Sequence, residues 1–138
     1  MAMEYKKPLP LPTNETLTQP FWEAAKRHEL MVQRCKNCDQ HFFYPRETCV
    51  RCLHGLEDLE WTRVSGMGRV YSFTIVHQPA DQAFVDDVPY VFAIIQLDEG
   101  PRMPGNVVGL SDPHDCHINM RVNVLFDDVT PTTTLAKW

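Results

Sequence analysis

Four cysteines constrain this chain more than any other feature of its sequence. They form two Cys-x₂-Cys pairs, Cys35 with Cys38 and Cys49 with Cys52, and ten residues separate the pairs. Two residues between paired cysteines let both sulfurs reach one tetrahedral Zn²⁺ at about 2.3 Å, and the longer gap accommodates a short hairpin. Four thiolates also complete the coordination sphere, which leaves no position for water or substrate. The spacing therefore predicts a structural zinc site rather than a catalytic one.

Other uses of these cysteines fit the rest of the sequence less well. The chain has five cysteines, so they cannot all form disulfides, and it opens without the apolar segment of a secretory signal. No strand-helix-strand pattern surrounds either pair, as a thioredoxin-like redox motif would require. Iron remains an alternative metal, because a rubredoxin-like site uses the same ligands. His41 and His54 flank the pairs and are interpreted as bystanders, since the cysteines already fill the site.

Charge is distributed unevenly along the 138 residues. Residues 1–19 are neutral, residues 20–54 have a net charge of +2, and residues 55–138 carry five basic and twelve acidic groups, a net −7. An acidic C-terminal region repels phosphate backbones, which argues against nucleic-acid binding. The length suits one compact domain with a small appendage. No apolar run approaches the roughly 20 residues of a membrane span, and the free cysteines favour the cytoplasm, so we expect a soluble cytoplasmic protein.

Residues 1–29 are predicted to form an N-terminal arm followed by a helix. Closely spaced prolines and few apolar residues indicate an extended arm, either disordered or docked on the body. Thr18 can cap a helix that has Pro20 in its first turn, so the helix is expected at about 18–29. Its apolar face, which includes Trp22, should pack against the next element or, less commonly, against a partner.

Residues 30–60 are predicted to form the zinc ribbon. A short strand over 30–34 leads into the first cysteine pair. Between the pairs, the aromatic run 42–44 can cover the metal sulfurs, and Pro45 then ends the extended segment. A unit this small cannot build a core of its own, so its folding is expected to depend on the metal.

Residues 61–138 are predicted to form a small antiparallel barrel. Tyr71, Phe73 and Ile75 alternate with polar residues and indicate a half-buried strand. The run 90–97 is apolar on both faces, as expected for a strand buried within a barrel and beneath another element. Glycines and prolines separate these segments, which is typical of such barrels. In all, four strands are expected, at about 71–75, 90–97, 107–110 and 122–126.

No group of residues with catalytic spacing emerges from the sequence, so no catalytic residue is predicted. The chain lacks a nucleophile motif and a glycine-rich phosphate loop. One segment contains several metal-ligand residue types, but Pro113 prevents a regular element there and loop side chains can point in any direction. It is interpreted as a polar loop with one free cysteine; its residues are Asp112, His114, Asp115, Cys116 and His117.

Several motifs taken together resemble a known family. They are Phe21-Trp22-Glu23-Ala24, the two cysteine pairs, Phe43-Tyr44-Pro45-Arg46, Gly66-Met67-Gly68, Pro89-Tyr90-Val91, Leu97-Asp98-Glu99-Gly100 and Val124-Leu125-Phe126. From about Phe21 onward the chain resembles the stand-alone acyl-CoA-associated proteins that join a rubredoxin-like zinc ribbon to an OB-fold. The resemblance implies a mainly β fold: an N-terminal helix, a rubredoxin-like zinc ribbon over 30–60, and a small antiparallel OB-fold barrel over 61–138.

The resemblance also implies a function. Members of this family look like non-catalytic accessory subunits that form hetero-oligomers with thiolase-like enzymes, of condensing, thiolytic or retro-aldol type, which act on acyl-CoA. Others assemble with hot-dog-fold enoyl-CoA hydratases. A rival interpretation is a stand-alone single-stranded nucleic-acid-binding OB protein, with Tyr71, Phe73 and Phe92 as stacking platforms, although the acidic barrel counts against it. A free-standing small enzyme is a second rival, and the missing catalytic group is the objection to it.

The partner and ligand surface is expected on the side of the helix and ribbon, at Trp22, Phe43, Arg46 and Arg51. Residues 20–54 are the one net-basic block and hold many aromatic residues. Arginine can pair with phosphate through two hydrogen bonds and can stack on a flat ring, and CoA presents both groups. The alternative is that both arginines are solvated, or are attracted to the negatively charged zinc tetrathiolate.

Overall fold

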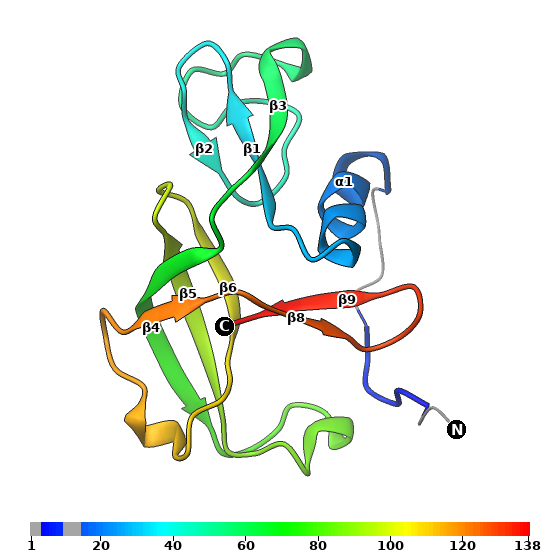
Figure 1. Cartoon of the computed structure of the whole chain (residues 1–138), viewed down its shortest axis with the longest axis vertical. Helices are drawn as coiled ribbons and strands as arrows, with labels where there is room; N and C mark the ends of the chain where they lie inside the picture. The colour runs from blue at the N-terminus through cyan, green and yellow to red at the C-terminus, as the bar shows by residue number, and fades with distance from the viewer. Residues whose placement is uncertain (1–3, 10–14) are drawn as a thin grey trace.

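A computed structural model describes residues 4–9 and 15–138, which contain one α-helix and nine β-strands (Figure 1). The ribbon forms one end of the molecule, the OB-fold strands form the other, and the helix lies beside the segment that joins them. The helix in this described part is too short and too polar to cross a membrane.

Helix α1 spans Glu15–Lys26, so the predicted helix at 18–29 was placed three residues too late at each end. Thr18 is a residue of the helix rather than its cap, and Pro20 lies inside it. The helix ends early because His28 adopts a left-handed conformation, with φ of 62°, which terminates the helical hydrogen-bonding pattern. The sequence offered no glycine to mark that position.

The ribbon contains a three-stranded antiparallel sheet in the order β2-β1-β3. Its strands are β1 (Met31–Cys35), β2 (His41–Phe42) and β3 (Leu59–Arg63). The strand expected at 30–34 therefore lies within one residue of its observed bounds. Strand β3 runs across the predicted boundary between residues 60 and 61, because all five of its residues pair with β1. The position of that boundary stays a prediction.

Four antiparallel strands in the order β6-β5-β4-β7 form the main sheet of the C-terminal part. They are β4 (Met67–Val76), β5 (Tyr90–Leu97), β6 (Arg102–Val107) and β7 (Arg121–Asn123). The third strand was wrongly expected at 107–110. The observed strand ends at Val107 and contains Pro104, which is unusual in a strand because proline cannot donate a ladder hydrogen bond. Strand β6 tolerates Pro104 because it is an edge strand of this sheet.

Strands β8 (Leu125–Asp128) and β9 (Thr134–Lys137) form a separate antiparallel pair. The strand expected at 122–126 is thus divided at Val124, whose N–H donates to the Gly66 carbonyl at 2.7 Å. Strand β9 was not predicted. Trp138 connects β9 to β6: its N–H donates to Asn106 at 2.9 Å, and its carbonyl accepts from Val108 at 2.6 Å. The sheets do not form one closed barrel.

A β-bulge in β4 changes which side chains reach the core. The register of β4 against β5 shifts between Val70 and Ser72. Val70 is completely buried, whereas Tyr71 is 48% exposed on the outer face. Phe73 and Ile75 pack against the core as predicted. Tyr71, expected on the same face of this half-buried strand, instead lies outside the core, because the extra residue of a bulge breaks strict alternation.

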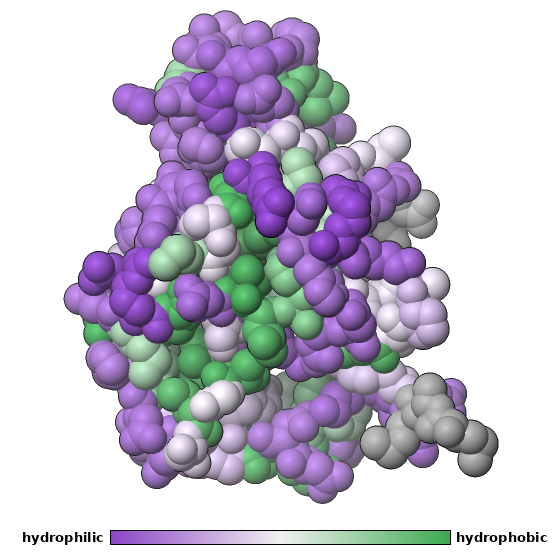
Figure 2. Space-filling view, viewed as in Figure 1, coloured by the Kyte–Doolittle hydropathy of each residue, from purple (hydrophilic) through white to green (hydrophobic). Residues whose placement is uncertain are grey.

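Strand β5 buries one face and leaves the other partly open. Val91, Ala93, Ile95 and Leu97 belong to the core, whereas Phe92 is 43% exposed. The expectation that both faces of this strand are buried is therefore wrong for the chain alone. Figure 2 shows apolar side chains gathered across the middle of the OB-fold end, while the surface of the ribbon is mainly polar on the same side. The core lies inside the OB-fold end and extends to α1 through Phe21.

Candidate metal centre and partner surface

The four sulfurs of the cysteine pairs converge in the ribbon. The Sγ atoms of Cys35, Cys38, Cys49 and Cys52 all lie within 4.8 Å of one another. Sγ of Cys35 is 3.6 Å from that of Cys52, and Sγ of Cys38 is 3.5 Å from that of Cys49. Sulfurs around a tetrahedral Zn²⁺ stand about 3.8 Å apart when each Zn–S bond is about 2.3 Å. The two shortest of these distances lie within about 0.3 Å of that value, and none of the six exceeds it by more than about 1 Å, so the cluster is of the right size for one such ion.

Each cysteine pair sits on a tight turn of the same design. In the first turn, the Asp39 N–H donates to the Cys35 carbonyl at 2.8 Å; in the second, the Leu53 N–H donates to the Cys49 carbonyl at 3.1 Å. The residue after each second cysteine is left-handed, with φ of 63° at Asp39 and 64° at Leu53. This repeated geometry turns both sulfurs of a pair toward the same point.

Backbone N–H groups also point at the sulfurs of the second pair. The Arg51 N–H lies 3.4 Å from Sγ of Cys49. The His54 backbone N–H lowers the pKa of Cys52 to about 6, and the Cys52 backbone N–H lowers the pKa of Cys49. Donation to sulfur favours the thiolate, which is the form that binds metal. The second turn thus favours the thiolates of Cys49 and Cys52. At Cys38 a backbone hydrogen bond involving Gln40 lowers the pKa, but burial and the neighbouring sulfurs raise it to about 12.

The two histidines beside the cysteine pairs stay outside this cluster. Nδ1 of His54 lies 2.6 Å from a carboxylate oxygen of Asp58, and that hydrogen bond raises the pKa of His54. Among the described residues, the four cysteines form the one group of His, Cys, Asp and Glu side chains with metal-binding spacing, so His41 does not join it either. Two of the ligands, Cys35 and Cys49, are fully buried beside Phe42.

The polar loop between β6 and β7 forms local hydrogen bonds. The Asp112 carboxylate accepts from the His114 backbone N–H at 2.9 Å and contacts Nδ1 of the same histidine at 2.9 Å. Cys116 is free and buried, and burial raises the pKa of its thiol. A buried neutral thiol of this kind packs as a small apolar group.

Trp22 and Phe43, two of the residues expected to contact a partner, come together in the structure. The Phe21 ring packs edge-on against Trp22, with centroids 5.1 Å apart, and is tilted against Phe43 at 5.6 Å. These rings line a mainly apolar groove of about 410 Å³, here called the helix-ribbon groove. Its further lining comes from β6 and β9, at Met103 to Asn106 and Leu135 to Lys137. Sequence reasoning missed these residues, because no local pattern brings β6 and β9 beside the helix.

Arg46 and Arg51, the other two expected contact residues, lie outside the groove. Both are exposed, and neither has a carboxylate within salt-bridge distance among residues 4–9 and 15–138. The backbone of Arg46 is held by the buried side chain of Gln33, which accepts from the Arg46 N–H at 2.6 Å and donates to the Arg46 carbonyl at 2.9 Å. The structure therefore unites the two aromatic residues and leaves the two arginines at the ribbon surface.

The N-terminal arm rests on the OB-fold end where it is described, at residues 4–9. Tyr5 and Lys7 are half-buried, and Nζ of Lys7 lies 2.6 Å from a carboxylate oxygen of Asp87. That hydrogen bond raises the pKa of Lys7. The arm borders a second hollow, of about 470 Å³, which Phe92 also lines. In the rest of the predicted arm, residues 1–3 and 10–14 lie outside the described part of the chain, and residues from Glu15 onward belong to α1.

Comparison with known families identifies both halves of the chain. Residues 22–59 match the rubredoxin-like zinc ribbon domain of ChsH2, and residues 61–127 match the C-terminal OB-fold domain of ChsH2. The two matches follow the order of the ribbon and the OB-fold strands seen here. The chain belongs to the ChsH2 family. This membership confirms the resemblance noted in the sequence and the mainly β fold class predicted from it.

Similar proteins place this ChsH2-family chain among DUF35 proteins. It is 41% identical to a DUF35 domain-containing scaffold protein of Methanocaldococcus jannaschii, over 76% of this chain and 73% of that one. It is 37% identical to a probable enoyl-CoA hydratase alpha subunit of Thermomonospora curvata, over 83% of this chain but only 35% of the longer subunit. A solved structure described as an Ltp2-ChsH2(DUF35) aldolase contains a chain with 33% identity and a TM-score of 0.79, covering 92% of this chain and 96% of that chain.

Proposed function

We propose that this chain is a non-catalytic accessory subunit that assembles with a thiolase-like enzyme acting on acyl-CoA, of condensing, thiolytic or retro-aldol type. The observation that carries the proposal is the end-to-end likeness to a chain of the Ltp2-ChsH2(DUF35) aldolase. A likeness that covers nearly all of both chains favours a shared role for the whole chain. The relative named as a scaffold protein supports the same role.

In this proposal the metal is zinc and its role is structural. All four donors are cysteine thiols that converge around one point, which is the preferred donor set of a closed zinc site. Cys35, Cys38, Cys49 and Cys52 would hold the ion, and no ligand position would remain for a substrate. The zinc would fix the two turns of the ribbon, and the reacting groups would come from the partner. Metal analysis of the purified chain distinguishes zinc from iron.

The helix-ribbon groove and the adjacent arginines are proposed as the surface that meets the partner enzyme. Trp22 and Phe43 present aromatic area at the groove, which is typical of the energetically important residues of interfaces. Arg46 follows Pro45, which lines the groove, and Arg51 lies in the second cysteine turn; both are exposed and would pair with carboxylates of the partner. The groove lies where α1, the ribbon and the OB-fold strands meet, so a partner bound there would contact all three.

A second candidate partner is a hot-dog-fold enoyl-CoA hydratase subunit. The observation in its favour is the 37% identity to a probable enoyl-CoA hydratase alpha subunit. The present chain corresponds to about a third of that subunit's length, so the catalytic part of such a complex would lie in a separate chain here. The accessory role is the same in both candidates, and the class of partner differs.

Co-expression tests the proposal directly. The chain is produced together with a candidate thiolase-like enzyme from the same organism, and the mass of the complex is measured by size-exclusion chromatography with light scattering. We expect both chains to elute in one peak whose mass exceeds that of either alone. A parallel preparation with a hydratase subunit tests the second candidate. Separate elution in both preparations would overturn the accessory role.

A further inference from the structure

The register of the main sheet aligns three arginines in one row. Arg121 on β7 pairs with Arg69 on β4, Arg69 pairs with Gln96 on β5, and Gln96 pairs with Arg102 on β6. Residues directly opposite one another in neighbouring strands point to the same face of a sheet. All three arginines are exposed, whereas the residue that follows each of them in its strand is buried. The row, called here the arginine row, therefore crosses the outer face of the four strands.

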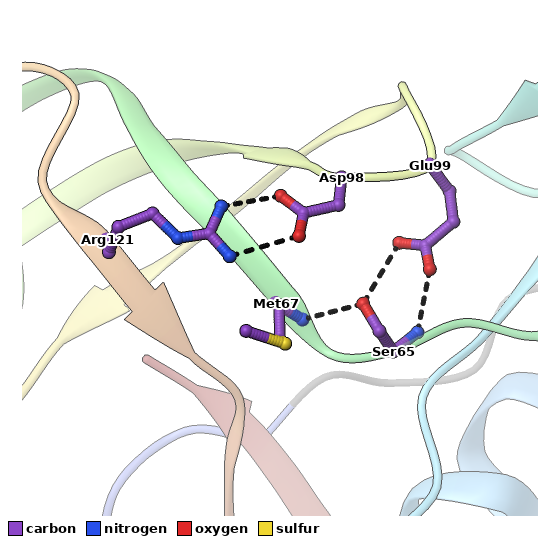
Figure 3. Close-up of polar contacts among 5 residues, drawn as sticks. All are labelled: Ser65, Met67, Asp98, Glu99 and Arg121. Carbon is purple, nitrogen blue, oxygen red and sulfur yellow. Dashed lines mark hydrogen bonds and ion pairs between the residues drawn. The ribbon is translucent and has the colours of Figure 1, made fainter.

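Among the described residues, only one member of this row has a carboxylate within salt-bridge distance, although the charge of Arg69 also helps to lower the pKa of Asp98. Both oxygens of Asp98 bind the Arg121 guanidinium, at 2.7 and 3.0 Å (Figure 3). Glu99, the next residue, instead accepts from the Ser65 backbone N–H at 2.8 Å (Figure 3). Within the described residues, no carboxylate lies within salt-bridge distance of Arg69 or Arg102. Like charges opposite one another destabilise a sheet. A bound anion would reduce the repulsion between these guanidinium groups.

An aromatic ring holds one of these free arginines in place. The Arg102 guanidinium lies 3.7 Å from the centroid of the Tyr71 ring. The bulge in β4 is what brings Tyr71 to the outer face. Stacking fixes the plane of a guanidinium and leaves its N–H groups free to donate at the edge. Beside Tyr71 lies a hollow of about 220 Å³, which Arg69, Gln96 and Asp98 also line and which Arg102 does not reach.

We propose that the arginine row, together with Tyr71, binds the phosphates at the nucleotide end of CoA. Strands are about 4.8 Å apart, so Arg69 and Arg102 are about 10 Å apart across Gln96, a span suited to a ligand with several phosphates. CoA carries a diphosphate and a separate 3′-phosphate. The choice of CoA rests on the proposed function, because the row alone specifies only phosphate groups.

The charge of the surrounding domain favours a small phosphate ligand over a polymer. Residues 55–138 carry a net charge of −7, so a long phosphate backbone would be repelled beyond the row. A small ligand would contact only the arginines of the row and would not extend over the acidic surface around them. The arginine row is also separate from Arg46 and Arg51, which lie in the ribbon between residues 45 and 52.

Calorimetric titration of the metal-loaded full chain tests the site. The ligands are CoA, 3′-dephospho-CoA and pantetheine, which differ in their phosphates. We expect CoA to bind most tightly, 3′-dephospho-CoA more weakly, and pantetheine not at all. Higher ionic strength should weaken CoA binding, because the contacts are solvent-exposed charges. Equal binding of pantetheine and CoA would overturn the assignment to phosphate.

Variants separate the row from other arginines. Arg69→Ala and Arg102→Ala should each weaken CoA binding about tenfold or more, as expected for the loss of one hydrogen bond to a charged group. Asp98→Asn should tighten CoA binding, because it releases Arg121 and removes a negative charge from the hollow. Arg63→Ala is the matched control, since Arg63 is exposed on β3 and faces Glu29 at 3.8 Å. Unchanged metal content and circular dichroism confirm that each variant is folded.

Three outcomes contradict the inference: CoA affinity unchanged in both alanine variants, no gain in Asp98→Asn, or tighter binding of a single-stranded oligonucleotide than of CoA. Association with the partner enzyme is measured on the same variants and should be unchanged, since the row lies outside the helix-ribbon groove. If the unmodified chain binds CoA through the row but binds no partner enzyme, the accessory role is refuted and the CoA site stands. If the unmodified chain binds the partner enzyme but not CoA, the CoA site is refuted and the accessory role stands.

Discussion

Gly105 lies directly against the indole of Trp138. A Cβ atom added at Gly105 would stand 2.6 Å from Cδ1 and 2.7 Å from Nε1 of that ring, closer than such contacts ever come. Trp138 is only 4% exposed, and its indole N–H has no hydrogen-bond partner among the described residues. Packing rather than a side-chain hydrogen bond therefore holds the ring. The contact fixes the end of β9 against β6, where the two sheets meet and the helix-ribbon groove begins.

Replacing Gly105 with alanine should destabilise the OB-fold end. The added methyl group must displace the rigid indole ring or the strand, and overpacking of this kind costs about 1–3 kcal/mol in the free energy of unfolding. Urea unfolding followed by tryptophan fluorescence measures the effect. Gly55→Ala is a suitable control, because its Cβ would meet only the flexible carboxylate of Glu57. Equal midpoints for Gly105→Ala and the parent would show that the contact is not tight.

Replacing Cys49 with serine should abolish metal binding and unfold the ribbon. A structural metal site rarely exists before folding, so its binding energy is folding energy for a unit of this size. We expect about one metal ion per parent chain and none in the variant, measured by mass spectrometry of the metals, while amide signals from the OB-fold strands persist. Cys116→Ser serves as the control, because Cys116 is buried outside the cluster and should keep the metal. Full metal content in Cys49→Ser is incompatible with the proposed site.

The isolated chain should show no thiolase, aldolase or hydratase activity on acyl-CoA. A metal held by four cysteines has no position for a substrate, so catalysis must use groups supplied by the partner. Activity is measured on the chain alone, on the partner alone and on the reconstituted complex. Turnover by the chain after the partner has been removed would disprove the accessory role.

Loss of Arg46 or Arg51 should weaken association with the partner enzyme. Each alanine variant removes a charged hydrogen-bond donor from an exposed position, so the chain itself should stay folded. The expected cost is about 1.5–3 kcal/mol in the free energy of association, or about tenfold or more in affinity. Lys36→Ala on the first turn of the ribbon is the control for a general loss of positive charge. If both arginine variants bind the partner as tightly as the unmodified chain, the interface does not include these arginines.

The pair formed by Asp98 and Arg121 should make stability depend on pH. The hydrogen bond from Arg121 holds the pKa of Asp98 below its usual value. A carboxyl with a lowered pKa stabilises the fold above its unfolded pKa of about 3.9, and that contribution disappears as the pH falls through the folded value. The difference in urea midpoint between the parent and Asp98→Asn should therefore favour the parent at pH 7 and shrink below pH 4. A difference that is constant over this range would mean that the charge of Asp98 contributes nothing.

The sequence by itself indicated the four-cysteine cluster, most of the strands and the family. Two Cys-x₂-Cys pairs at this spacing favour a ribbon, because two residues between paired cysteines allow a tight turn that directs both sulfurs to one metal ion. Alternation at Phe73 and Ile75 correctly indicated a strand with one face in the core. These are local properties, and they can be recognised within a window of a few residues.

Tertiary structure alone decided the features that depend on pairing between distant strands. The bulge that exposes Tyr71, the place of Pro104 in an edge strand and the contact of Gly105 with Trp138 follow from register and packing. The arginine row is the clearest case: Arg69, Arg102 and Arg121 are far apart in the sequence, and each is unremarkable there. A shift of one residue in register would turn a strand's side chains to the opposite face, so only the folded sheet could align them.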